Sequence, residues 1–222
     1  YGIHSRNRTV VDECVKEFDC ISWENSDEML QDPNLDIVYV ASPIGIHAEQ
    51  GTRILEADKH FWCEKPLTTS LKDTKELIKL ATNTNLTVAE GFMYLYHPQF
   101  LWLKNYLSQY KNEEIKIINC TFTLPYTDNP GFRYNPSLGG STLLDIGTYL
   151  TSAVFGLIEN EEPEILLKLG LSPQLNFIYM LAFENLSFIN LETKYIHTTY
   201  PIRTIVEKEK YRGCTEYSIF FV

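Results

Sequence analysis

Short apolar runs alternate with helix-like segments over the first half of the chain, and this alternation constrains the fold more than any other feature. The clearest run, Asp36–Ser42, is continuously apolar between polar ends, as expected of a strand buried on both faces. Other strand-like runs occupy residues 1–5, 61–63 and 86–91, and helical patterns occupy residues 10–18, 26–30, 46–57, 70–83 and 97–110. This order predicts a parallel sheet with crossover helices.

The pattern changes in the second half. Residues 115–124 alternate as a strand does, and one long helical segment (140–156) precedes strand-like runs at 164–171, 176–183, 186–194 and 202–209. Residues 184–185 suit a hairpin between two of these runs. A helix followed by a meander of strands predicts a mixed sheet with helices on one side. We therefore expect one domain over residues 1–112 and an α+β domain over residues 113–222, divided at the polar stretch 111–114.

Composition excludes several classes of partner. The net charge of −10 disfavours nucleic acid and anionic membranes. No apolar run approaches the roughly 20 residues of a membrane span. The five cysteines form no C-x-x-C pair, so we expect reduced thiols in a cytoplasmic protein and no metal site. The apolar ends of the chain lead us to expect that residues are missing at both termini.

Glu64-Lys65-Pro66 directly follows the strand-like run that ends at Cys63. In open parallel sheets, ligands bind at the carboxyl ends of the strands. Lys65 is therefore a candidate for a positioned cation, with Pro66 fixing the chain after it in a tight turn that we expect to be cis. The alternative is a solvated strand end, which accounts for most such charged pairs.

The helical segment after Gly139-Gly140 carries Asp145 and Tyr149, four residues apart and hence neighbours. Their side of the helix has no Lys, Arg or Glu over about four turns, which favours the wall of a polar cleft. The alternative is a buried helix whose Asp and Tyr are satisfied by hydrogen bonds. A lysine, an aspartate and a tyrosine brought together could move a proton while a hydride moves elsewhere.

Four motifs occur in order: residues 42–49 (SPIGIHAE), 63–67 (CEKPL), 97–100 (HPQF) and 131–149, which begins Gly-Phe-Arg. In these motifs the chain resembles the glucose–fructose oxidoreductase/inositol dehydrogenase (Gfo/Idh/MocA) family, from residue 1 to about residue 156. The resemblance implies a Rossmann-type dinucleotide-binding domain and a second domain with a mostly antiparallel, open sheet that mediates homo-oligomers. It implies NAD(P)-dependent chemistry on a sugar, sugar nucleotide, cyclitol or cyclic diol.

The resemblance also implies roles for single residues. Lys65 would contact the cofactor ribose and the reacting hydroxyl, and Asp145 would orient the substrate. Tyr149 stands where many members have His, and Arg133 falls in the same substrate-binding motif. A neighbouring ammonium favours phenolate, which would make Tyr149 a usable acid or base near neutral pH.

The cofactor residues implied by the resemblance are Ser42, Pro43, His47 and Glu64, together with Lys65. Ser5-Arg6 ends the opening strand, where an NAD-specific enzyme usually carries an acidic residue. A hydroxyl followed by arginine suits a 2′-phosphate, so we expect NADP, with NAD as the alternative.

The family's glycine-rich finger (G-x-G-x-x-G) is absent from the chain. Without the strand that carries it, the strands at 1–5 and 36–42 would flank an empty slot. Either the N-terminus is missing, which we favour, or cofactor binding is lost. In the latter case the chain would be a non-catalytic ligand-sensing or scaffold protein.

Overall fold

The computed structural model describes residues 1–109, 117–125, 131–157, 164–172, 176–183, 186–196, 204–211 and 214–221. The chain divides into two compact units. Unit 1 holds residues 1–42 and 46–91, and unit 2 holds residues 43–45 and 92–222.

The division falls after Gly91, earlier than the expected boundary at residues 111–114. The reason lies in helix α5 (Pro98–Leu107), which contributes Phe100, Leu103 and Leu107 to a core cluster that also contains Leu150 of unit 2. The sequence pattern placed this helix in the first domain, because the helix follows the last strand of the parallel sheet. The apolar side chains of α5, however, are buried against residues of unit 2.

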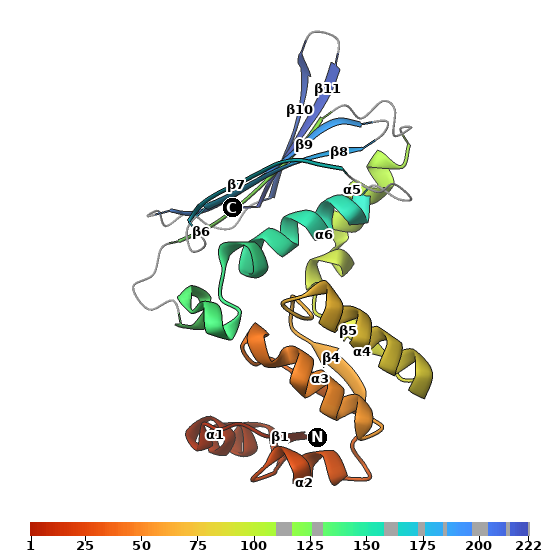
Figure 1. The fold of residues 1–222 in the computed structure, drawn as a ribbon, viewed down its shortest axis with the longest axis vertical. Coiled ribbons are helices and arrows are strands. Elements are labelled where there is room, and N and C mark those ends of the chain that lie inside the picture. The colour runs from red at the N-terminus through yellow and green to blue at the C-terminus, as the bar shows by residue number, and fades with distance from the viewer. Residues whose placement is uncertain are drawn as a thin grey trace. The chain divides into compact units, whose positions relative to one another are not determined.

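Unit 1 is built from short strands and helices in alternation (Figure 1). Its strands are β1 (Gly2–Ile3), β2 (Ile21–Ser22), β3 (Ile37–Val40), β4 (His60–Cys63) and β5 (Val88–Glu90). Its helices are α1 (Arg8–Phe18), α2 (Ser26–Gln31), α3 (His47–Glu56) and α4 (Leu71–Thr84). Strands β3, β4 and β5 form a parallel sheet in that order, and β1 and β2 form a second parallel pair. The predicted parallel sheet with crossover helices is confirmed.

Local sequence explains where the long helix α4 begins and ends. The Ser70 hydroxyl accepts the Asp73 N–H at 3.1 Å, and Asn85 takes the left-handed conformation at the other end. The inner face of α4 buries Leu77 and Ala81 in a core with Phe61 of β4. This packing fixes the sheet against α3 and α4.

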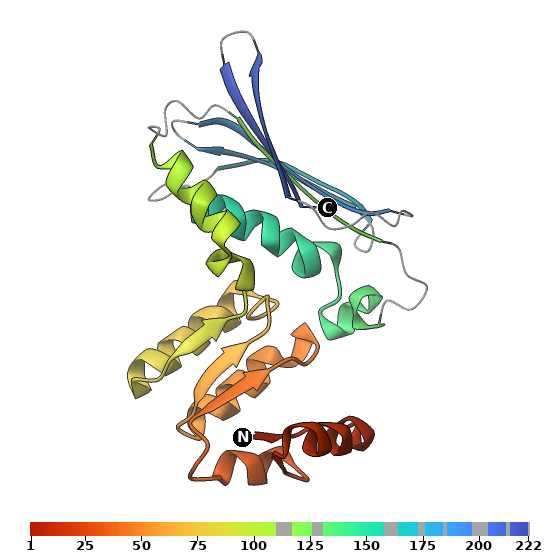
Figure 2. The ribbon, with the colours of Figure 1, turned by 180° about the vertical axis from the view of Figure 1, so that it is seen from behind.

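One expectation for β3 is wrong. Ile37 and Tyr39 remain 50% and 49% exposed, so this strand is buried on one face only. Trp62, opposite Tyr39 on β4, is 46% exposed. The core residues of β3 and β4 lie on the opposite face, which α3 and α4 cover (Figure 2).

Strands β1 and β3 belong to different sheets, since β1 pairs with β2 and β3 with β4. The expectation that a further strand belongs between them stays a prediction.

Unit 2 combines helices with a larger sheet. Its helical elements are η2 (Met93–Tyr96), α5, η4 (Gly131–Tyr134), η5 (Pro136–Leu138), the π-helical η6 (Leu143–Gly147) and α6 (Thr148–Leu157). Of η1 (Ile44–Ile46), the first two residues are assigned to unit 2 and the last to unit 1. Its strands are β6 (Ile117–Pro125), β7 (Glu164–Ser172), β8 (Asn176–Phe183), β9 (Leu186–Ile196), β10 (Thr204–Tyr211) and β11 (Cys214–Phe221).

The six strands follow the order β10-β11-β6-β9-β8-β7. Pairs β10–β11, β8–β9 and β7–β8 are antiparallel, whereas β11–β6 and β6–β9 are parallel. Helices α5 and α6 lie together on one side of this sheet, where they share a core with β6 (Figures 1 and 2). The expected hairpin residues 184–185 lie outside the described residues.

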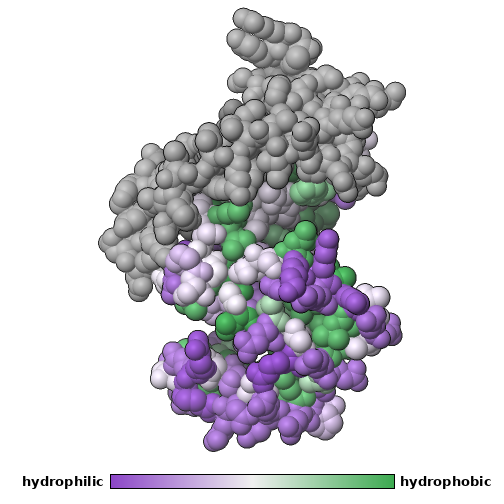
Figure 3. All heavy atoms as spheres, in the orientation of Figure 1, coloured by the Kyte–Doolittle hydropathy of each residue, from purple (hydrophilic) through white to green (hydrophobic). Residues whose placement is uncertain are grey.

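The surface over α1 and α2 is mainly hydrophilic (Figure 3). This agrees with their burial, since Val11 is the one buried residue of α1 and α2 has none. Among the helices that the structure describes, none combines the length and apolarity needed to cross a membrane.

Candidate functional site

The carboxyl ends of β3, β4 and β5 bring several predicted site residues together within unit 1. Ser42 follows β3, Glu64 and Lys65 follow β4, and His47 is the first residue of α3. The parallel register aligns these strand ends at one edge, with Val40 opposite Cys63 and Cys63 opposite Glu90. Lys65 thus lies at the carboxyl edge of the parallel sheet, as the sequence predicted.

Backbone and side-chain contacts hold the turn that carries Lys65. The Glu64 N–H donates to Val40 O at 2.8 Å, and the Leu67 N–H donates to Glu90 Oε1 at 2.7 Å. Glu64 accepts the Tyr39 hydroxyl on one oxygen and the Lys65 N–H on the other, the latter at 3.3 Å. The Lys65–Pro66 peptide is cis, as expected. The Glu64 carboxylate therefore links strand β3 to the turn that carries Lys65.

His47 was predicted to line the cofactor, but it is completely buried. Its Nδ1 lies 3.0 Å from Pro66 O and its Nε2 lies 2.8 Å from Ser42 O. The Ser42 hydroxyl in turn donates to Gln50 Oε1 at 2.6 Å. Both residues are thus occupied in joining strand ends within unit 1.

The electrostatics of this edge centre on Glu90. Desolvation raises the pKa of Glu90, while the Leu67 N–H and the charges of His47 and Lys65 act in the opposite direction. Burial, reinforced by Glu90 and Glu64, raises the pKa of the neighbouring Cys63 thiol to about 12.

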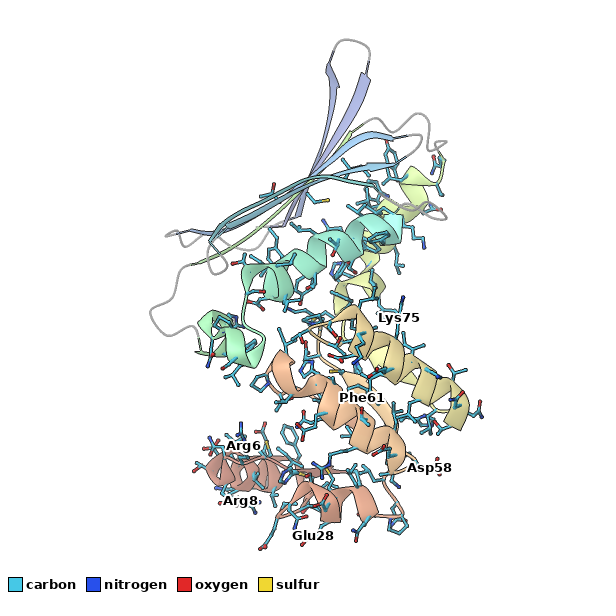
Figure 4. The ribbon with its side chains drawn as sticks, in the orientation of Figure 1. Arg6, Arg8, Glu28, Asp58, Phe61 and Lys75 are labelled. Carbon is cyan, nitrogen blue, oxygen red and sulfur yellow. The ribbon has the colours of Figure 1, made fainter. Side chains whose placement is uncertain are left out.

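Ser5 and Arg6 lie between β1 and α1, at the amino-terminal end of that helix (Figure 4). The Ser5 hydroxyl accepts the Asn7 N–H at 3.2 Å, and Asn7 caps the helix by accepting from Val10 N. Arg6 is exposed, whereas Arg8 donates to Trp23 O at 3.3 Å. Arg6 is thus available to an anion at this position.

In unit 2, Arg133 and Asp145 form an ion pair, with Arg133 Nε 2.9 Å from Asp145 Oδ2. The carboxylate side chain is 6% exposed and the guanidinium 43%. Asp145 therefore does not lie on an open cleft wall, as expected from its helical face, but is buried beneath Arg133. Asp145 lies in a π-helical turn, in which the Thr148 N–H reaches back five residues to Leu143 O. Such turns occur frequently at functional sites.

Tyr149 is surrounded by aromatic rings. The ring centroids of Phe122, Phe92 and Tyr94 lie 5.3, 5.7 and 5.9 Å from that of Tyr149. The Tyr94 hydroxyl is hydrogen-bonded to Ser152 Oγ at 2.7 Å, and burial raises the pKa of Tyr94 to about 12. The arrangement fixes the Tyr149 ring and marks Tyr94 as a phenol that stays protonated.

The predicted residues therefore form two groups. Unit 1 assembles Ser42, His47, Glu64 and Lys65 at one sheet edge, and unit 2 pairs Arg133 with Asp145, one helical turn before Tyr149. Pro43 belongs by its contacts to unit 2.

Sequence reasoning missed two supporting residues in unit 1, Glu90 and Tyr39. Glu90 had a usable signal, because it is an acidic residue at the end of a predicted parallel strand. Tyr39 had none, because its hydroxyl reaches Glu64 only through strand pairing. Within the described part of the chain, no group of three or more His, Cys, Asp or Glu side chains could hold a metal ion.

Comparison with known proteins places these observations in a family. The model of an oxidoreductase family with an NAD-binding Rossmann fold matches residues 1–92, nearly the extent of unit 1. A dTDP-3,4-didehydro-2,6-dideoxy-alpha-D-glucose 3-reductase of Saccharopolyspora spinosa is 35% identical over 148 residues, 67% of this chain and 45% of the relative. A trans-1,2-dihydrobenzene-1,2-diol dehydrogenase of Xenopus laevis is 31% identical over 143 residues, 64% of this chain and 43% of that protein.

A solved 3-ketoreductase from Actinomadura kijaniata, in complex with NADP and TDP-benzene, shares the fold with a TM-score of 0.76 at 24% identity. The likeness covers 98% of this chain and 75% of that one. The chain spans less than half the length of the two curated relatives. The resemblance seen in the sequence is confirmed: residues 1–92 match the model of the Gfo/Idh/MocA oxidoreductase family, which describes an NAD-binding Rossmann fold.

Proposed function

We propose that the protein is an NAD(P)-dependent oxidoreductase that transfers a hydride between nicotinamide and a hydroxyl-bearing carbon of a sugar, sugar nucleotide, cyclitol or cyclic diol. The observation that carries this proposal is the position of Lys65. It follows β4 at the carboxyl edge of a parallel sheet whose sequence matches an NAD-binding family. That edge is where ligands bind in open parallel sheets.

The residues present fit an anionic dinucleotide in part. Lys65 and the exposed Arg6 supply positive charge after β4 and β1 respectively. Ser5 precedes Arg6, and a hydroxyl followed by a guanidinium suits the 2′-phosphate of NADP. This pair supports NADP over NAD. The G-x-G-x-x-G finger is not among the residues of this chain.

The proposed chemistry divides among three side chains. A bound nicotinamide supplies or accepts the hydride. Tyr149 donates or accepts the proton of the reacting hydroxyl, as a phenol near an ammonium can do. Lys65 supplies that ammonium and holds the reacting oxygen. Asp145, ion-paired with Arg133 at 2.9 Å, orients the substrate, and the partly exposed Arg133 offers further donors to it. The meeting of Lys65 with Asp145 and Tyr149 is part of the proposal.

The substrate class is narrowed by the relatives. The similarity to a dTDP-sugar 3-reductase supports a keto sugar nucleotide, and the similarity to a diol dehydrogenase supports a cyclic diol. We favour the sugar nucleotide because its relative is the more similar, at 35% against 31% identity. We also propose that copies assemble through the six-stranded sheet. Sedimentation analysis tests this, and a monomer at working concentration contradicts it.

The cofactor prediction is tested with Arg6→Ala. NADPH should bind the unmodified protein more tightly than NADH, as measured by titration of nicotinamide fluorescence. Loss of one charge-assisted contact is expected to weaken NADPH binding by about 1.5–3 kcal/mol, roughly tenfold to 150-fold, with little effect on NADH. Arg8→Ala is the matched control, because Arg8 already donates to Trp23 O. Equal affinities for the two nucleotides contradict the NADP assignment.

Absence of binding to either nucleotide contradicts the enzyme assignment and leaves the ligand-sensing alternative. If binding is observed, the oxidation of NADPH with keto sugar nucleotides, sugars, inositols and cyclic diols, followed by absorbance, identifies the substrate class.

A further inference from the structure

The His47 ring lies between two backbone carbonyl groups with no exposure to solvent. Nδ1 is 3.0 Å from Pro66 O, and Nε2 is 2.8 Å from Ser42 O. A carbonyl oxygen only accepts hydrogen bonds, so each of these contacts requires a proton on the ring nitrogen. A neutral imidazole carries one N–H and can satisfy one of the two carbonyls. Both contacts together require the doubly protonated ring.

Two other histidines, His60 and His97, show the contrast, whereas the Nδ1 of the partly exposed His4 lies 3.2 Å from Trp23 O. The Nδ1 atoms of His60 and His97 accept backbone N–H groups, from Thr87 at 3.0 Å and from Gln99 at 3.2 Å. A nitrogen that accepts must carry a lone pair, so both rings have an unprotonated Nδ1. At His47, by contrast, both ring nitrogens face carbonyl oxygens, which accept hydrogen bonds and do not donate them.

A buried cation requires a compensating negative charge. Glu90, at the end of β5, is placed to supply it, because its carboxylate contacts Leu67, the neighbour of the Pro66 whose carbonyl meets His47. Desolvation raises the pKa of Glu90, and the Leu67 N–H and the charges of His47 and Lys65 act against that rise. The same carboxylate accepts the Leu67 N–H at 2.7 Å. Glu90 therefore contacts the Lys65 turn on the residue after Pro66, while His47 contacts it on Pro66 itself.

We propose that His47 is a buried imidazolium which, with Glu90 as its counter-ion, clamps the turn that carries Lys65 to the end of β3. His47 is then a positioning residue and not a cofactor ligand. The clamp joins three strand ends through Ser42, Pro66 and Leu67, and so fixes the backbone on either side of Lys65. What the fixed Lys65 does there rests on the proposed function; the charge state of His47 does not.

The test is a long-range ¹H–¹⁵N spectrum of the protein labelled with ¹⁵N-histidine, recorded at pH 7 without cofactor or substrate. We expect two protonated nitrogens for His47, and a bare Nδ1 for His60 and for His97. A bare nitrogen on His47 overturns the proposal. Because no turnover is measured, this outcome is independent of the enzyme assignment.

Glu90→Gln keeps an acceptor for the Leu67 N–H but removes the charge, so His47 is expected to lose one ring proton. Glu49→Gln removes the same charge from an exposed position two residues beyond His47 and should leave the ring signals unchanged. A His47 ring that stays doubly protonated in Glu90→Gln overturns the pairing.

His47→Gln is expected to lower turnover about tenfold to a hundredfold, as small misplacements of a reacting group do. Turnover equal to that of the unmodified protein overturns the positioning role. If the variant does not fold, the histidine spectrum of the unmodified protein still decides whether the His47 ring is doubly protonated.

Discussion

Replacing Tyr149 by Phe should separate the chemical role of this residue from its structural one. The substitution removes one hydroxyl and keeps the ring, whose neighbours Phe122, Phe92 and Tyr94 lie at centroid distances of 5.3–5.9 Å. Each such aromatic pair contributes about 0.5–1.5 kcal/mol beyond burial. Because all three pairs survive, the thermal transition should stay nearly unchanged.

The expected loss of activity is large by comparison. Removing a general acid or base lowers turnover by roughly two to four orders of magnitude, about 2.7–5.4 kcal/mol of activation free energy. Tyr149→Ala removes the ring as well, and should also destabilise the protein by about 3–5 kcal/mol. A fall in turnover without a fall in stability is therefore the signature of the phenol.

The assay is NADPH oxidation on a verified substrate, with thermal unfolding followed by circular dichroism on the same samples. Tyr94→Phe is the matched control, because the Tyr94 ring contacts Tyr149 but its hydroxyl is bonded to Ser152 and its pKa is raised to about 12. It should retain most turnover. Lys65→Met should lower both turnover and cofactor affinity, and Asp145→Asn should have an intermediate effect. If Tyr149→Phe keeps turnover near that of the unmodified protein, or if Tyr94→Phe falls as far, the acid/base assignment is wrong.

Two further predictions concern the unit that holds Lys65. Gly51→Ala places a Cβ 2.4 Å from the ring of the core residue Phe61, so overpacking should destabilise the protein by about 1–3 kcal/mol. In a Phe61→Leu background the same change should stabilise by up to about 1 kcal/mol through helix propensity, as urea unfolding would show. Burial raises the pKa of the Cys63 thiol to about 12, so its reactive thiolate is suppressed at pH 8. Iodoacetamide should therefore modify the partly exposed Cys14 and Cys20 before Cys63, as peptide mass spectrometry would show, and early modification of Cys63 contradicts its burial.

Much of the fold could be predicted from the sequence, because each element of the first half has a local signal. Apolar runs bounded by polar residues marked β3, β4 and β5, and the helical pattern of residues 70–83 marked α4. The place of Lys65 followed from the same logic, since the residue after a parallel strand lies at the carboxyl edge of the sheet. These features depend on residues close together in the chain.

Contacts between distant residues were decided by the tertiary structure alone. Helix α5 belongs to unit 2 because Phe100 and Leu103 pack into the core that contains Leu150. Asp145 is buried and forms its ion pair with Arg133, twelve residues earlier. His47 contacts both Ser42, five residues before it, and Pro66, nineteen residues after it, and so joins two strand ends. The periodicity of the sequence predicts the face of a helix or strand on which a side chain lies. The distant residue that the side chain contacts, and hence its charge and role, depends on how the elements pack together.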